Sequence, residues 1–146
     1  MPEEKVKLIA DSADMVVGGY AFTKKDGKIA VLNINNPEYA MVLSIEGKEL
    51  VVTSGMLADD WDGQIPEDFE TEVRHTILAC ERVLKEAGCG LEHVFNVEVY
   101  MRDMAQWSDF NKVYCEMMPD PKPCRKALEV GLVPGLNVEI VMWAVK

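Results

Sequence analysis

A glutamate near the C-terminus is the first residue whose surroundings suggest acid–base chemistry. Glu139 stands at the start of an otherwise apolar row, because Val141, Trp143 and Val145 follow it at alternate positions of a strand-like segment. Partial burial raises a carboxyl pKa toward neutrality, so this group could accept a proton or orient a water molecule. From position alone, Glu139 could equally lie at the rim of a sheet and form an ion pair with a lysine.

The second candidate is Arg125, which lies in the cationic segment Lys122-Pro123-Cys124-Arg125-Lys126 of a strongly acidic chain. A guanidinium group offers a rigid fork of donors that matches a carboxylate. A fixed arginine beside a pocket can therefore capture a small organic acid. The alternative is a solvated basic turn that offsets the charges of Asp120 and Glu116.

The other reactive side chains give no metal site. The four cysteines form no C-x-x-C pair, and no histidines lie at zinc-finger spacing from them: Cys80, Cys89, Cys115 and Cys124. We interpret all four as reduced, buried apolar residues. The sequence also has no phosphate-binding glycine motif and no H-E-x-x-H motif. We therefore expect chemistry that needs neither a metal nor an organic cofactor.

Two amphipathic helices and three strands are predicted to position these residues. Apolar residues recur every three or four positions over 66–87 and over about 104–118, which predicts two helices. Segments 94–101, 124–130 and 136–145 have the alternation or length of strands, and the last is long enough to be central in a sheet. The polar stretch 58–64 is predicted to be a surface loop.

Two hairpins are predicted in the N-terminal third of the chain. Runs rich in β-prone residues over 20–23 and 28–34 flank Asp26-Gly27, a strong hairpin signal. Asn35-Asn36-Pro37 ends this hairpin, and a second one joins residues 39–45 to 49–54. Because two helices cover one face of a mixed sheet of about six strands, the other face needs another copy of the chain, which predicts a homo-oligomer.

Composition limits the partners of the protein. The 146 residues are 49% hydrophobic and 27% charged, as in a folded soluble domain. The formal charge of −10 repels a phosphate backbone. The sequence shows neither an apolar leader nor an apolar run of membrane length. We therefore expect a cytoplasmic protein with no nucleic-acid and no membrane partner.

Several short motifs follow one another from residue 36 onward. They are Pro37-x-Tyr39, Leu50-Val51-Val52-Thr53-Ser54-Gly55, Lys85-Glu86-Ala87-Gly88, Val99-Tyr100-Met101-Arg102-Asp103-Met104, Trp107-x-x-Phe110-Asn111-x-x-Tyr114, Pro123-Cys124-Arg125 with Glu129-Val130, and Val138-Glu139-Ile140. In order and spacing, this series resembles the RidA/YjgF family of reactive intermediate imine/enamine deaminases. We assign 1–35 to an N-terminal extension with a β-hairpin and 36–146 to a RidA-like domain.

The resemblance implies a chorismate-mutase-like α+β fold that forms a homotrimer, with active sites in clefts between neighbouring subunits. It implies that Arg125 holds the substrate carboxylate and that Glu139 serves the attacking water as the second catalytic residue. Four further residues fall where the family has residues that line the pocket and bind substrate: Tyr39, Ser54, Gly55 and Asn111. Lys126 and Ala127 stand where the family often has Ser or Thr and then Cys, so the pocket wall is expected to differ.

The function implied by the resemblance is hydrolytic deamination. The substrates would be reactive 2-imino or 2-enamino acids, such as 2-aminoacrylate and 2-iminopropanoate, and the products 2-keto acids and ammonia. The enzyme would thus be a hydrolase like the 2-iminobutanoate/2-iminopropanoate deaminases. The alternative is a non-catalytic protein that binds or senses a small carboxylic or keto acid on the same trimeric fold. A ribonuclease activity ranks last because of the net charge.

Overall fold

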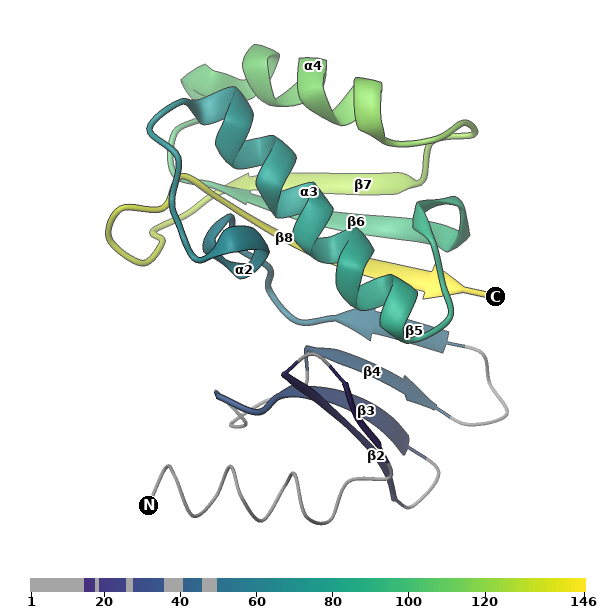
Figure 1. Ribbon diagram of the computed structural model, residues 1–146. Helices are drawn as coiled ribbons and strands as arrows, with labels where there is room; N and C mark the ends of the chain where they lie inside the picture. Colours follow the sequence, from purple (N-terminus) through teal and green to yellow (C-terminus); the bar gives the residue numbers. More distant parts are fainter. Residues whose placement is uncertain (1–14, 18, 26–27, 36–40, 46–49) are drawn as a thin grey trace.

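The computed structural model describes residues 15–17, 19–25, 28–35, 41–45 and 50–146. These form one eight-stranded mixed sheet with two main helices on one face, which confirms the predicted α+β class (Figure 1). The strands are β1 (Met15–Val17), β2 (Tyr20–Lys25), β3 (Lys28–Asn33), β4 (Val42–Ile45), β5 (Leu50–Thr53), β6 (Val94–Met101), β7 (Cys124–Glu129) and β8 (Val138–Val145). Their order across the sheet is β1-β2-β3-β4-β5-β8-β6-β7.

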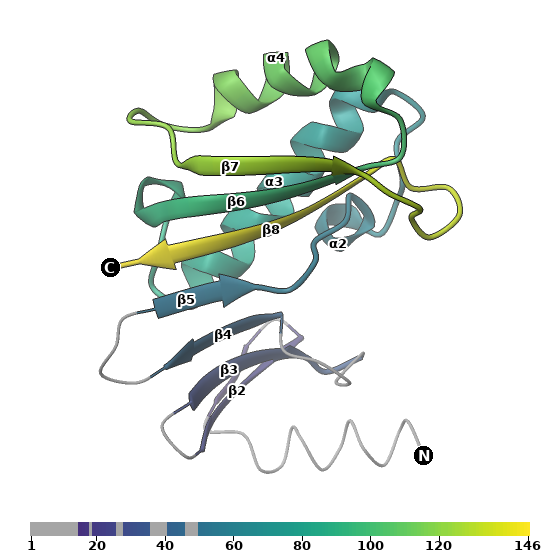
Figure 2. The same ribbon diagram turned by 180° about the vertical axis from the view of Figure 1, so that it is seen from behind.

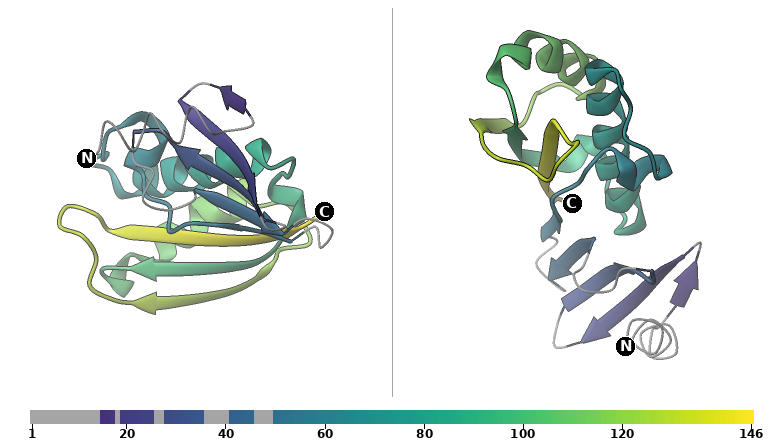
Figure 3. Two further views of the ribbon diagram at one scale, coloured as in Figure 1. Left: turned by 90° about the horizontal axis from the view of Figure 1, so that it is seen from below. Right: turned by 90° about the vertical axis from the view of Figure 1, so that its left-hand side faces the viewer.

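Strands β1 to β5 form an antiparallel meander that contains both predicted hairpins. The first is the pair β2 and β3, and the second is the pair β4 and β5. The turns at 26–27 and 46–49 lie outside the described residues. Because β3 also pairs with β4, the N-terminal strands continue the sheet of the rest of the chain, as the side view in Figure 3 shows.

Helices α3 (Phe69–Glu86) and α4 (Trp107–Met117) cover the same face of the sheet (Figure 1). The first begins three residues later than predicted, because the carboxylate of Asp68 accepts a hydrogen bond from Thr71 N and caps it there. The second is preceded by a 3₁₀ turn, η2 (Met104–Gln106), where Asp103 caps Ala105 N. The predicted loop contains a short helix, α2 (Asp59–Asp62).

The strand β8 lies inside the sheet, as predicted, between β5 and β6. The crossover from β6 to the parallel strand β7 carries α4, and a 3₁₀ turn, η1 (Leu91–His93), precedes β6. Along β8, every second side chain is fully buried beneath the helices: Val138, Ile140, Met142 and Ala144. The core therefore lies between the sheet and the helices, and the intervening residues point to the opposite face, which we call the open face.

The open face is not covered by any described helix. Figure 2 looks onto it, with β5 to β8 in front of α3. It carries apolar side chains, including Leu128 at 49% exposure and Val145 at 48%. The indole Nε1 of Trp143 is buried and has no hydrogen-bond partner among the described residues. An exposed apolar sheet face of this kind is consistent with the predicted homo-oligomer, which stays a prediction.

The cysteines depart from the sequence-based interpretation. All four are free, but Cys115 and Cys124 are exposed, whereas Cys80 and Cys89 are buried as predicted. Cys115 lies on the solvent side of α4, and Cys124 begins β7 at the edge of the sheet.

None of the helices in the described ranges is long and apolar enough to cross a membrane.

Candidate functional site

The side chain of Arg125 points from β7 into the helix layer. Its register partner on β6 is the fully buried Val97, which places both on the helix-covered face. Arg125 Nη1 donates a hydrogen bond to Asn111 Oδ1 on α4 at 2.7 Å. Its Cζ lies 4.6 Å from the ring centre of Trp107 and 4.6 Å from that of Tyr114. The guanidinium group is thus held by one helix face through a hydrogen bond and two cation–π contacts.

The spacing of residues on α4 explains this arrangement. Trp107, Phe110 and Tyr114 are three and four residues apart, so their rings share one face of the helix. Neighbouring rings of this aromatic row are 5.6 Å apart and nearly parallel. Asn111 lies four residues after Trp107, and its amide oxygen reaches the same guanidinium. The row therefore forms a wall of fixed rings beside Arg125.

The structure does not support the alternative of a solvated basic turn around Arg125. Asp120 pairs with Lys122 at 3.1 Å, and Glu116 pairs with Arg74 at 3.0 Å. In the described part of the chain, no carboxylate pairs with Arg125, and its one hydrogen-bond acceptor is the neutral Asn111. A half-buried guanidinium with most of its donors unused is suited to bind an anion.

The carboxyl group of Glu139 lies on the open face, beside Gly55. Its register partner is Tyr100, which also points away from the helices. A Cβ atom at Gly55 would lie 2.8 Å from Glu139 Oε2, so a larger residue there would displace the carboxyl group. Burial, together with the nearby charge of Asp60, raises the pKa of Glu139. No ion pair with a lysine, the alternative left open by the sequence, occurs among the described residues.

The segment that follows β5 is fixed along β8. The main chains of Met56 and Ile140 exchange two hydrogen bonds, of 2.8 and 3.1 Å. Asp60 Oδ2 accepts a hydrogen bond from Leu57 N at 2.8 Å. Burial also raises the pKa of Asp60. Asp60 lies in the segment predicted to be a polar surface loop, and its effect on the pKa of Glu139 was not predicted.

The predicted site residues fall into two groups. The arginine cluster consists of Arg125, Asn111 and the aromatic row, and the carboxyl cluster consists of Glu139 and Gly55, with Ser54 next in the chain. Tyr39 lies outside the described residues. The two clusters are on opposite faces of the sheet, because Arg125 aligns with a helix-facing residue and Glu139 with an open-face residue. One chain therefore does not bring them to one ligand.

The roles of Trp107 and Tyr114 beside Arg125 were not predicted. Their helical spacing indicated an apolar stripe, which is usually core. Asn111 could have indicated that this helix face contacts a polar group, because it is a polar residue four positions after Trp107 and three before Tyr114. Within the described ranges, no group of three or more His, Cys, Asp or Glu residues could hold a metal ion.

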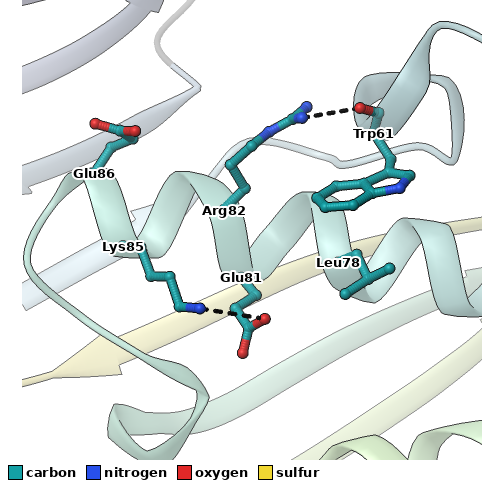
Figure 4. A pocket seen from close by; sticks show the side chains of 6 residues that line it. All are labelled: Trp61, Leu78, Glu81, Arg82, Lys85 and Glu86. Carbon is teal, nitrogen blue, oxygen red and sulfur yellow. Dashed lines mark hydrogen bonds and ion pairs between the residues drawn. The ribbon is translucent and has the colours of Figure 1, made fainter. Parts of the chain in front are cut away.

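A different arginine–aromatic contact lies at a cavity of about 230 Å³ between α2 and α3 (Figure 4). Arg82 Cζ is 4.9 Å from the ring centre of Trp61. Arg82 Nη1 donates to the carbonyl oxygen of Trp61 at 2.9 Å, and Nη2 donates to the carbonyl oxygen of Asp60. This cavity contains none of the predicted site residues.

Comparison with known proteins shows relatives over most of the chain. The family model described as Endoribonuclease L-PSP matches residues 33–146. Protein mmf1, mitochondrial, from Schizosaccharomyces pombe is 38% identical over 115 residues, which cover 73% of this chain and 71% of that protein. The 3-aminoacrylate deaminase RutC from Acinetobacter baylyi is 30% identical over 106 residues, covering 70% of this chain and 84% of RutC.

A solved structure of the same family has a similar fold. NMB1025 from Neisseria meningitidis, a member of the YjgF protein family, matches with a TM-score of 0.65 at 28% identity. The match covers 76% of this chain and 89% of that chain. The chain therefore belongs to the RidA/YjgF family, whose family model carries the description Endoribonuclease L-PSP.

Proposed function

We propose that the protein hydrolyses reactive 2-imino and 2-enamino acids, such as 2-aminoacrylate and 2-iminopropanoate, to 2-keto acids and ammonia. The observation that carries this proposal is the half-buried Arg125, which is held by Asn111 and two rings and has no carboxylate partner among the described residues. Its unused donors match the carboxylate of such a substrate. Family membership and the 30% identity to a protein named 3-aminoacrylate deaminase support the proposal.

The active site would lie between two copies of the chain. Since Arg125 and Glu139 are on opposite faces of one sheet, a site that uses both needs the arginine cluster of one copy and the carboxyl cluster of the next. The apolar open face is a surface that another copy would cover. With the family resemblance, this leads us to propose a homotrimer with three intersubunit sites, in which Tyr39 and Ser54 also line the pocket.

The reaction would proceed by addition of water to the imine. Arg125 holds the substrate carboxylate, and Glu139 takes a proton from the water as its oxygen attacks the imine carbon, so that the C=N π electrons move to nitrogen. Glu139 returns that proton to nitrogen, which gives a carbinolamine. Glu139 then takes the hydroxyl proton of the carbinolamine and delivers it to nitrogen, so that the C=O bond forms, the C–N bond breaks and ammonia leaves. A raised pKa suits a carboxyl group that acts as base and then as acid. General acid–base catalysis typically contributes about 10²- to 10⁴-fold.

Ammonia release from 2-aminoacrylate, generated in situ by a dehydratase, tests the proposal. We expect the wild type to exceed the spontaneous rate and Arg125→Ala and Glu139→Gln to lose most of that excess. Arg74→Ala is the matched control, because Arg74 is an exposed arginine whose partner is Glu116. A wild type no faster than the spontaneous reaction, or full activity in Arg125→Ala, would overturn the assignment.

The alternative function is non-catalytic binding or sensing of a small acid. Binding of a keto acid, with no ammonia release above the spontaneous rate, would indicate that function instead.

The partners we propose follow from the charge of the chain. Although the family description names an endoribonuclease, the charge of −10 disfavours contact with a phosphate backbone. We therefore propose small imino or keto acids as partners, with neither nucleic acid nor membrane. The cytoplasmic location stays a prediction, and the relative mmf1 is named as mitochondrial.

A further inference from the structure

Resting on the proposed function, we propose that Trp107 and Tyr114 are positioning residues that hold the Arg125 guanidinium ready for a carboxylate. Both rings lie 4.6 Å from Arg125 Cζ, whereas the ring of Phe110 between them lies 6.0 Å away. The N–H donors of a guanidinium lie in its own plane. Contacts over ring faces therefore restrict the group without using the donors that a carboxylate needs.

The position of Arg125 in the fold explains why it needs such support. It lies on β7, the last strand at one edge of the sheet, so the sheet holds the backbone of Arg125 from one side. A long, unrestrained arginine side chain has considerable rotamer entropy, part of which is lost when it binds a ligand. The rings and the bond to Asn111 impose this order before the ligand arrives. Binding should therefore be tighter than with a free arginine.

Trp107 is the better residue to test, because it is half-buried while Tyr114 is buried. Replacement by leucine removes the ring face but keeps an apolar side chain. We expect Trp107→Leu to weaken binding of pyruvate, the keto acid formed from 2-iminopropanoate, by about fivefold to tenfold. Binding of the uncharged analogue pyruvamide should change less than twofold. In turnover, the Michaelis constant should rise while kcat at saturation stays near the wild-type value.

Three variants separate positioning from a general structural effect. Trp107→Phe keeps an aromatic face and should restore most of the pyruvate affinity. Trp107→Leu in an Arg125→Ala background should cause no further loss, because the group to be positioned is absent. Trp61→Leu is the matched control, since it removes a ring that lies over Arg82 instead (Figure 4). It should bind pyruvate within twofold of wild type.

The inference would be overturned if Trp107→Leu bound pyruvate as the wild type does. It would also be overturned by equal losses for pyruvate and pyruvamide, or by a loss that persisted in the Arg125→Ala background. If the leucine variant does not fold, as judged by circular dichroism, Trp107→Met takes its place. Pyruvate binding is measured by NMR titration, which needs no turnover. If the variants show that Trp107 positions Arg125 but the protein releases no ammonia from the imine, only the proposed function is refuted.

Discussion

Two arginines of this protein each lie over a tryptophan ring, yet their remaining contacts differ. Arg82 Cζ is 4.9 Å from the ring centre of Trp61, and Arg125 Cζ is 4.6 Å from that of Trp107. Both terminal nitrogens of Arg82 donate to main-chain carbonyl oxygens at the end of α2. Arg125 donates one hydrogen bond, to Asn111. The ring contact is common to both arginines, so the hydrogen-bond donors distinguish their roles.

This difference separates a structural arginine from a binding arginine. The carbonyl groups at the end of a helix have no intrahelical partner, and Arg82 supplies donors for two of them in the short helix α2. Arg125 lies beside a wall of rings that cannot accept strong hydrogen bonds. We infer that Arg82 contributes mainly to the free energy of folding and Arg125 mainly to the binding of an anion.

The largest effect is expected from Arg125→Met, which keeps much of the side-chain length but removes the charge and all donors. We expect kcat/KM for ammonia release from 2-aminoacrylate to fall about 100-fold or more, because a charge-assisted bidentate contact is lost. The melting temperature should change by less than about 2 °C, because the loss of one hydrogen bond and two ring contacts is offset by removal of a half-buried charge that no described carboxylate neutralises. A loss of activity below threefold would contradict the comparison.

The opposite pattern is expected for Arg82→Met. Two hydrogen bonds to α2 and one cation–π contact are lost, which should lower the free energy of unfolding by about 2 kcal/mol and the melting temperature by about 4–6 °C. The control is Lys85→Met, because Lys85 lies on the same helix and its exposed ion pair with Glu81 is worth little. If Arg82→Met reduced kcat/KM of the folded protein as strongly as Arg125→Met, the two arginines would not have separate roles.

The main helices and strands were predictable because their regular patterns of apolar residues continue over many positions. α3 repeats its apolar spacing over several turns, and the alternation along β8 distinguishes its two faces. The ends of the elements were less predictable. The start of α3 depends on a side-chain cap from Asp68, whereas Pro66 and the acidic residues near it indicated an earlier start. The fold class depends on the long elements, so errors at their ends did not alter it.

The candidate site was predictable only where one residue was unusual for its surroundings. Arg125 is a cation in an acidic chain, and Glu139 is a carboxylate in an apolar row. Trp107 and Tyr114 were not singled out, because aromatic residues at helical spacing pack in the same pattern whether they contact a core or a guanidinium. Asp60 was missed since its effect on Glu139 depends on the bridge between β8 and the segment after β5.

Asp60 links the structural region around Arg82 to the carboxyl cluster. Its carbonyl oxygen accepts a hydrogen bond from Arg82. Burial is the main cause of the raised pKa of Glu139, and the charge of Asp60 is the second cause. In Asp60→Asn that charge is gone and the amide oxygen can still accept from Leu57 N, so the pKa of Glu139 should fall. The acidic limb of kcat/KM against pH should then move to lower pH.

The measurement for Asp60 is a pH–rate profile for wild type and variant, with Asp62→Asn as the control on the same helix. The control should leave the limb in place, because Asp62 is exposed and is not among the causes of the raised pKa of Glu139. A limb that moved to higher pH in Asp60→Asn would contradict the proposed electrostatic link between these two carboxyl groups.

The smallest effect concerns the stability cost of the carboxyl cluster, which contrasts with the stabilising role of Arg82. The pKa of Glu139 is raised in the folded protein, mainly by burial, so the unfolded chain loses that proton more readily. Stability therefore falls as pH rises from the ordinary glutamate value to the raised one, and the cost is fully present above both. At neutral pH, Glu139→Gln should melt about 1–2 °C higher than wild type while losing activity.

The pH dependence of this difference is the decisive observation. Below the ordinary glutamate pKa, Glu139 is protonated in both folded and unfolded chains, so the advantage of the glutamine variant should disappear there. Thermal melts of wild type and Glu139→Gln across that range measure it, with Glu67→Gln as an exposed control in which no such trend is expected. A glutamine variant that is less stable at neutral pH would mean that the carboxylate has a stabilising partner, and Glu139 would then resemble Arg82 more than Arg125.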